Sequence, residues 1–132
     1  MAVEVPERGR EILEKRSIGS LATLMPDGSP QVTPVWVDLD GNEILVNTLE
    51  GRLKPRNIRR DPRVAISIPD PDEPTVALIV RGGAELTTDG AEEHADALAK
   101  KYLGEDVFPW RAPGDVRMLI RVHPERVLMY GA

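Results

Sequence analysis

The sequence predicts a mainly β protein, a small β-barrel with two or three short helices packed outside it. Six or seven strand-like runs are rich in apolar and β-branched residues, and most are joined by short turns of Gly, Pro, Asp and Asn. A regular alternation of strands and helices, which a doubly wound parallel sheet requires, is absent. At 132 residues, the chain fits one domain that spans residues 1–132.

The N-terminal part of the chain predicts one short helix and then three strands. Pro6 and Glu7 are suited to the first turn of a helix that ends near Ser17. Turn-forming residues at 26–29 and 40–42 separate the strand-like runs that follow, as in an antiparallel meander. These runs are Ile18–Leu24, Gln31–Leu39 and Glu43–Thr48.

The middle of the chain predicts a helix of one or two turns followed by a strand. The helix covers Leu53–Arg60, with Pro55 in its first turn and Pro62 beyond its end. The strand covers Val64–Ile68. We expect the acidic, proline-rich stretch Pro69–Pro74 to form a loop that stays outside any sheet.

The C-terminal part predicts further strands around one amphipathic helix. Thr75–Thr88 alternates as a long strand, and Gly82 with Gly83 predicts a bulge or barrel corner within it. Two separate strands, Val116–Val122 and Arg126–Tyr130, are expected at the end of the chain.

The amphipathic helix is expected to begin at Asp89, because Glu92 follows three residues later as in a capping box. Gly104 is placed to end it. Its apolar face consists of Ala91, Ala95, Leu98 and Tyr102. A loop at Val107–Gly114 follows this helix.

Composition argues against several functional classes. The net charge of -5 and the 4% aromatic content disfavour binding to nucleic acid. With 41% hydrophobic and 30% charged residues, the composition is not that of a membrane protein. No apolar run approaches the roughly 20 residues of a spanning helix, and the charged stretch Met1–Arg10 does not resemble a signal peptide, so we expect a cytoplasmic protein. The chain has no cysteine, and His94 and His123 belong to no metal-ligand motif, so we expect structural histidines and no metal.

The most unusual feature is a basic segment from Gly51 to Arg63. Six cations and one acid, Asp61, give this segment a charge of +5, which leaves -10 for the rest of the chain. Arg52 and Lys54 come where a strand turns into a short helix, a position that favours phosphate binding. No P-loop or dinucleotide motif accompanies the segment. A solvated helix face is the alternative. The cations are Arg52, Lys54, Arg56, Arg59, Arg60 and Arg63.

The second unusual feature is a strand with a proline in its middle. Pro34 cannot donate a ladder hydrogen bond, which predicts an edge strand or a bulge there. Main-chain groups around it would be free to bond a flat heterocycle, with Thr33 and Trp36 beside it. The alternative is a plain edge strand with Trp36 in the core. We find no nucleophile with its base and no carboxylate pair, so catalytic residues are unassigned and a cofactor is expected to supply the chemistry.

The order of these features resembles the flavin-reductase-like split-barrel superfamily of pyridoxamine 5′-phosphate oxidase-like proteins, and within it the branch of oxidoreductases that depend on coenzyme F420, a deazaflavin. This resemblance implies an FMN-binding split barrel of six to seven antiparallel strands, which forms a homodimer. The segments that carry it are Ile18–Leu24, Thr33–Trp36, Arg52–Ile58, Asp61–Val64, Val116–Arg117 and His123–Val127.

The resemblance also implies a cofactor groove at each end of the dimer interface. The cofactor phosphate is expected at Arg52 and Lys54, and the tricyclic ring along the strand that contains Pro34. Trp110 and Arg111 are expected to help to line the groove. The cofactor-binding residues expected in this way are Thr33, Pro34, Val35, Trp36, Val37, Thr48, Arg52, Lys54 and Asn57.

The implied function is hydride transfer between reduced coenzyme F420 and a conjugated unsaturated small molecule. The acidic glutamyl tail of this cofactor favours it over FMN, because Arg56, Arg59 or Arg60 would be available to neutralise the tail. Three alternatives stay open: an FMN-dependent oxidase or reductase of the same fold, a non-enzymatic barrel that binds a cofactor, haem or another anionic metabolite, and a nucleic-acid-binding barrel.

Overall fold

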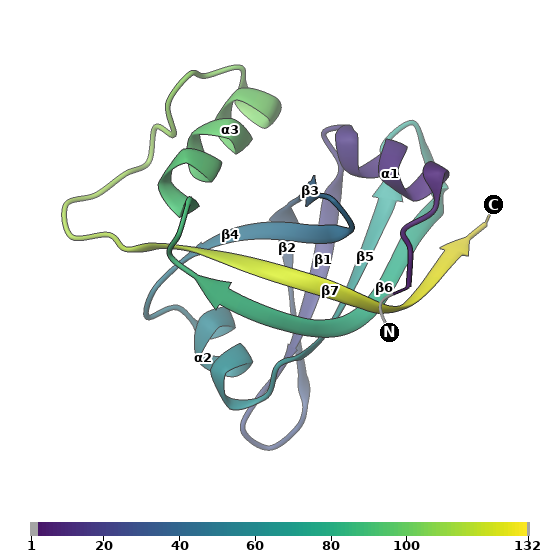
Figure 1. Cartoon of the computed structure of the whole chain (residues 1–132), viewed down its shortest axis with the longest axis horizontal. Coiled ribbons are helices and arrows are strands. Elements are labelled where there is room, and N and C mark those ends of the chain that lie inside the picture. Colours follow the sequence, from purple (N-terminus) through teal and green to yellow (C-terminus); the bar gives the residue numbers. More distant parts are fainter. Residues whose placement is uncertain (1–2, 132) are drawn as a thin grey trace.

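The computed structural model describes residues 3–131 and contains one curled antiparallel sheet with three helices (Figure 1). The order of its seven strands is β2-β1-β5-β6-β7-β4-β3. The predicted mainly β fold is therefore confirmed. The elements are α1 (Glu7–Glu14), β1 (Ile18–Leu24), β2 (Pro30–Trp36), β3 (Asp38–Asp40), β4 (Glu43–Leu49), α2 (Leu53–Arg60), β5 (Arg63–Asp70), β6 (Glu73–Thr87), α3 (Ala91–Leu103) and β7 (Arg117–Tyr130).

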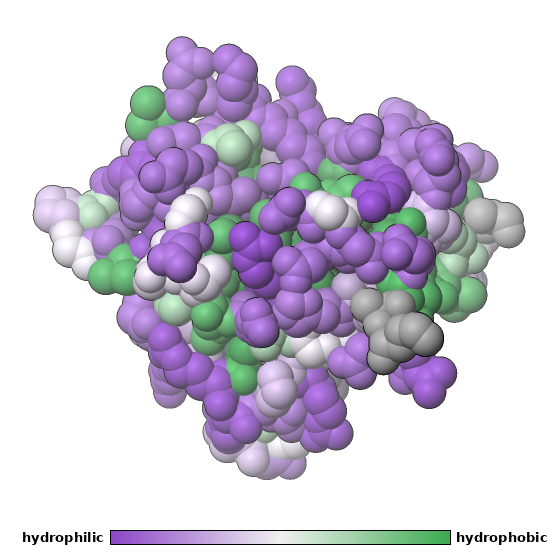
Figure 2. All heavy atoms as spheres, viewed as in Figure 1, coloured by the Kyte–Doolittle hydropathy of each residue, from purple (hydrophilic) through white to green (hydrophobic). Residues whose placement is uncertain are grey.

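The concave side of the curled sheet encloses the hydrophobic core. In β5, Val64, Ile66 and Ile68 are buried while the residues between them are not, as expected when successive side chains of a strand point to opposite faces. Ile12 and Leu13 of α1 are completely buried against this core. The outer surface is mostly hydrophilic on the face seen in Figure 2.

The predicted strand Gln31–Leu39 is divided into β2 and β3, which lie at opposite edges of the sheet. Only Val37 separates these two strands along the chain. The sheet must therefore curl until its two edges come close together. Pro34 lies in the edge strand β2, so the edge position predicted for it is confirmed.

The expected loop at Pro69–Pro74 is wrong, because β5 extends to Asp70 and β6 begins at Glu73. Pro69 pairs with Ala77 of β6. It is tolerated there because the pairing of β5 with β1 ends at Ser67, so no strand on the other side needs its missing N–H.

The two strands expected at the C-terminus are in fact one strand, β7. Pro124 lies opposite Gly82, where the register of β6 and β7 shifts, so the predicted bulge is confirmed and allows β7 to continue past the proline.

The predicted start of α3 at Asp89 is wrong. Gly90 caps the helix in a left-handed conformation with φ 73°, which glycine adopts without strain.

The buried carboxylate of Asp70 attaches α1 to the end of β5. It accepts hydrogen bonds from the Asp72 N–H at 2.9 Å and the Lys15 Nζ at 3.0 Å, and Arg8 Nη1 lies 2.6 Å away. These contacts lower the pKa of Asp70 to about 2, and the hydrogen bond from the Asp72 N–H has the largest effect.

None of the helices in residues 3–131 has the length and apolar character needed to cross a membrane.

We predict that Asp70→Asn lowers stability at neutral pH, because the charged carboxylate is the form that Arg8 and Lys15 stabilise. The folded pKa of about 2 lies below the unfolded value of about 3.9, so this stabilisation is complete above pH ~4 and is lost as the pH falls toward 2. Urea unfolding of both proteins should show a gap that closes over this range. A gap that persists at pH 2 would contradict the ionic origin.

We predict that Gly82→Ala destabilises the protein by about 2–3 kcal/mol, because a Cβ at residue 82 would lie 2.0 Å from the carbonyl oxygen of His123. Gly83→Ala is the matched control, since its nearest neighbour would be the flexible Glu125 carboxylate at 3.4 Å. Thermal unfolding of both variants checks this difference, and equal losses of stability would argue against close packing at the bulge.

Candidate functional site

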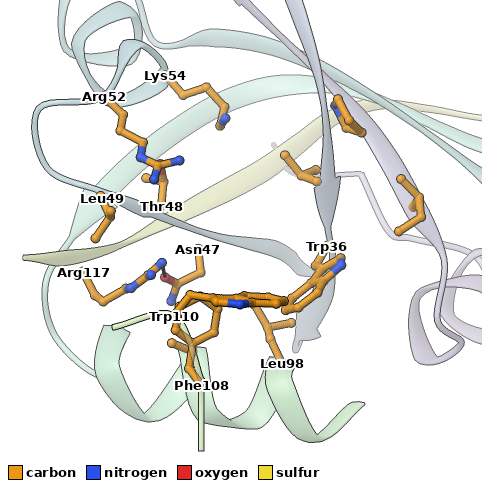
Figure 3. A pocket seen from close by; sticks show the side chains of 14 residues that line it. Trp36, Asn47, Thr48, Leu49, Arg52, Lys54, Leu98, Phe108, Trp110 and Arg117 are labelled. Atoms are coloured by element: carbon orange, nitrogen blue, oxygen red, sulfur yellow. Dashed lines mark hydrogen bonds between the residues drawn. The ribbon is translucent and has the colours of Figure 1, made fainter. Parts of the chain in front are cut away.

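A cavity of about 380 Å³ lies between the edge strand β2, strand β4 and helix α3 (Figure 3). One end of it is cationic, the opposite wall is aromatic, and polar groups of β4 and β7 form the side between them. The lining residues are Ile18, Pro34, Val35, Trp36, Asn47, Thr48, Leu49, Arg52, Lys54, Ala95, Leu98, Phe108, Trp110 and Arg117.

The cationic end is formed by Arg52, the N-cap residue of α2, and Lys54 in its first turn. Lys54 is half-buried, and its Nζ donates a hydrogen bond of 3.2 Å to the Thr33 hydroxyl of β2. Burial, and then the charge of Arg52, lower the pKa of Lys54. Within residues 3–131 no carboxylate forms an ion pair with either side chain. An anion bound here would remove their mutual repulsion.

Two of the other four cations of the basic segment are paired with carboxylates, and a third donates to neutral oxygens. Arg59 forms a two-pronged pair with Glu50, with both N–O distances 2.5 Å. Arg63 pairs with Asp61 at 2.7 Å and is the main reason that the pKa of Asp61 falls to about 2. Arg60 donates to the Leu24 carbonyl and to Asn57 Oδ1.

Flat side chains form the opposite wall. The ring of Trp36 is stacked on that of Tyr102, with centroids 4.8 Å apart and an angle of 2° between the planes. Trp110, which is 62% exposed, lies 6.3 Å from Trp36, and Phe108 contacts it edge-on. This arrangement provides an apolar surface for a planar molecule.

The third side of the cavity carries a guanidinium group. Arg117 Nη1 donates a hydrogen bond of 3.2 Å to Asn47 Oδ1, and the guanidinium carbon lies 4.2 Å from the centroid of the Phe108 ring. Burial is the first cause that lowers the pKa of Arg117. The cavity thus offers hydrogen-bond donors and positive charge on two sides.

The structure brings together six of the nine residues that we predicted as cofactor ligands, namely Pro34, Val35, Trp36, Thr48, Arg52 and Lys54. Thr33 lies next to the cavity through its bond to Lys54. Val37 and Asn57 are not among the residues that line it, and both are completely buried. Of the two loop residues, Trp110 lines the cavity, whereas Arg111 pairs with Glu92 and Asp96.

Asn57 has a structural environment. Its amide nitrogen donates to the Thr23 hydroxyl at 3.0 Å, and its oxygen accepts from Arg60 at 2.8 Å. Thr23 is also buried, so this pair connects α2 to β1.

Sequence reasoning did not assign Asn47 and Arg117 to the site, although both line the cavity. Asn47 directly follows the apolar run Ile44–Val46 of β4. An amide directly after an apolar run of a strand is the signal that could have identified it.

We predict that Asn57→Ala lowers the free energy of unfolding by about 1–3 kcal/mol, because it removes the buried hydrogen bond to the Thr23 hydroxyl and the bond from Arg60. Arg56→Ala, on the exposed side of the same helix, is the control and should change stability little. Urea denaturation measures both. Unaltered stability of the Asn57 variant together with loss of cofactor binding would favour the ligand role expected from the sequence.

Known proteins of related sequence and structure share this architecture. A family model described as pyridoxamine 5′-phosphate oxidase matches residues 5–131. A solved F420 reductase is 36% identical, with a TM-score of 0.80 over 94% of this chain and 98% of its own. The conserved hypothetical protein Rv2991 from Mycobacterium tuberculosis is 22% identical, with a TM-score of 0.78 over 98% of this chain and 86% of its own. General Stress Protein 26 from Bacillus anthracis is 19% identical, with a TM-score of 0.71 over 94% and 92%. At 22% and 19% identity, the last two proteins show a similarity of fold alone.

Proposed function

The chain belongs to the pyridoxamine 5′-phosphate oxidase family, and from this premise we propose that it transfers a hydride between reduced coenzyme F420 and a conjugated unsaturated small molecule. The observation that carries the proposal is the pair Arg52 and Lys54, which face a cavity beside a proline-containing edge strand without a carboxylate partner in residues 3–131. Such a site suits an anionic group attached to a flat ring.

The residues present fit such a cofactor. The cavity of about 380 Å³ lies in the range of roughly 300–1,000 Å³ that is usual for small-molecule sites. Arg52 and Lys54 would hold the phosphate, since no side chain of residues 3–131 caps the first turn of α2. The edge strand β2 would lie along the ring, because alternate main-chain groups of an edge strand have no neighbouring strand. When bound, the deazaflavin supplies the hydride chemistry.

The choice of F420 over FMN rests on two observations. The F420 reductase that is 36% identical to the chain covers almost its whole length. Arg56 is exposed, and its side chain makes no hydrogen bond or ion pair with any part of residues 3–131, so it is available for an acidic tail. Arg59 and Arg60 no longer support this choice, because Glu50 and Asn57 already bind them.

FMN-dependent oxidation or reduction is the second candidate, because FMN also combines a phosphate with a tricyclic ring and would suit the same cavity.

With either cofactor, the contribution of the protein is to bind and orient the cofactor and the substrate and to exclude water. No cavity side chain is assigned as a proton donor. Tyr102 is unsuited to this role, since burial raises its pKa to about 12 and its hydroxyl donates to the Ser17 carbonyl.

A homodimer is part of the proposal. Exposed apolar side chains occur next to the cavity at Ile18 and Val116, and on β7 at Leu128 and Tyr130. A second copy that covered the side chains near the cavity would shield the ring from water.

We predict that Arg52→Ala and Lys54→Ala each weaken F420 binding at least tenfold, because each removes one charge-assisted contact to the phosphate, worth about 1.5–3 kcal/mol. Cofactor fluorescence in an equilibrium titration measures the dissociation constants. Arg63→Ala is the control, since Arg63 is 78% exposed and paired with Asp61.

Unchanged affinity in both variants would remove the phosphate assignment. A parallel titration with FMN distinguishes the two cofactors, and tighter binding of FMN would favour the second candidate. F420 binding without reduction of any conjugated enone or quinone tested would instead support a non-enzymatic carrier.

A further inference from the structure

Four side chains from four different elements form a hydrogen-bonded chain that ends in the cavity. Asp38 of β3 lies 3.2 Å from the Nε2 of His94 of α3. The Nδ1 of the same histidine lies 3.3 Å from the Asn47 amide nitrogen of β4. Asn47 Oδ1 then accepts from Arg117 Nη1 of β7. His94 is 8% exposed, so the middle of this chain is shielded from solvent.

The direction of each hydrogen bond follows from groups that can only donate or only accept. The guanidinium of Arg117 can only donate, so the oxygen of Asn47 must face it. The amide nitrogen of Asn47 is thereby directed to the Ala91 carbonyl, at 2.9 Å, and to His94 Nδ1. This Nδ1 must therefore be the acceptor, which places the proton of the neutral imidazole on Nε2, facing Asp38.

Of these four hydrogen-bonded side chains, Arg117 is the only charged one that lines the cavity. Its Nε is buried and has no hydrogen-bond partner in the described chain. Its bond to Asn47 is to a neutral oxygen, so the positive charge is not compensated by a direct ion pair within residues 3–131. Because Arg117 is partly buried, leaving its charge without a counter-ion is costly, and an anionic ligand in the cavity would remove this cost.

We infer that Arg117 is a second anion-binding side chain of the cavity, and that Asn47, His94 and Asp38 are positioning residues that hold its guanidinium toward the ligand. The ligand group is an anionic oxygen, a carboxylate or a phosphate. The inference rests on the cavity being the ligand site proposed above, but it does not depend on the identity of the cofactor. It requires the bound molecule to carry an anionic oxygen at the side of the cavity formed by β4 and β7.

Inorganic sulfate tests the anion site without any cofactor. Trp36 and Trp110 both line the cavity and are the two tryptophans of the chain, so intrinsic fluorescence reports binding there. The titration uses the Arg52→Ala/Lys54→Ala double variant, in which the proposed phosphate site is removed. We expect saturable sulfate binding that weakens at least tenfold when Arg117→Gln is added.

Arg121→Gln in the same double variant is the matched control, because Arg121 lies on the same strand but pairs with Asp40 and Glu43 outside the cavity. We expect this control to bind sulfate within twofold of the double variant. Absence of saturable sulfate binding in the double variant, or a change of less than twofold on adding Arg117→Gln, overturns the inference. Failure of F420 to bind would leave it intact.

The positioning role is tested by two substitutions of one residue. His94→Leu removes both hydrogen bonds of the imidazole, and we expect sulfate affinity to fall at least threefold although Arg117 keeps its charge. His94→Gln can accept from Asn47 and donate to Asp38, so it should restore most of the affinity. Equal affinities in the two variants, with both folded by circular dichroism, would contradict the positioning role.

The anionic oxygen could belong to the cofactor or to the substrate, and the single variant Arg117→Gln distinguishes the two. Weaker F420 binding in the fluorescence titration assigns the oxygen to the cofactor. A raised KM for a carboxylate-bearing enone, with unchanged F420 affinity and unchanged KM for the corresponding neutral enone, assigns it to the substrate. If none of these constants changes, Arg117 contacts no ligand and the inference is overturned.

Discussion

The structure depends on how the two edges of its sheet are joined. Val37 connects the edge strands β2 and β3, and it is completely buried at the point where the chain passes from one edge to the other. A buried residue between two strands cannot leave its backbone groups unpaired. The last turns of α3 solve this problem, since the Tyr102 hydroxyl lies 2.9 Å from the Val37 N–H and Lys101 Nζ donates to the Val37 carbonyl at 2.8 Å. In the described chain β2 and β3 do not pair with each other, so helix side chains, and not strand pairing, hold the junction between the two edges.

This closure also builds the cavity. Because the Tyr102 hydroxyl is hydrogen-bonded to the Val37 N–H, the Tyr102 ring lies flat against Trp36 at the end of β2. This stacking fixes the position of the aromatic wall. The same helix places Leu98 at the cavity and His94 against Asp38 and Asn47. The contact that stabilises the fold and the contacts that shape the site thus come from successive turns of one helix. A change in the position of α3 would alter both.

The sequence predicted the features that depend on local patterns. Alternating apolar residues indicated most strands, Pro34 indicated an edge strand, and the turn after β4 indicated where Arg52 and Lys54 would meet the cavity. It could not predict partners that are distant along the chain. The bond of Asn57 to Thr23 spans 34 positions, and that of Arg117 to Asn47 spans 70. Charge counting also overestimated the free cations, because Glu50, which compensates Arg59, lies just outside the basic segment.

The distribution of compensated and uncompensated cations is the strongest physical argument for a ligand site. The protein pairs Arg59 and Arg63 with carboxylates at the surface, where each pair contributes little to stability. It leaves Lys54 and Arg117, which are more buried, without a direct carboxylate partner in residues 3–131, although there the absence of a counter-charge costs most. A sequence optimised for stability alone would reverse this arrangement. Natural proteins retain such unfavourable groups mainly where a bound molecule supplies the missing charge, so the cost in the free protein becomes affinity for the ligand.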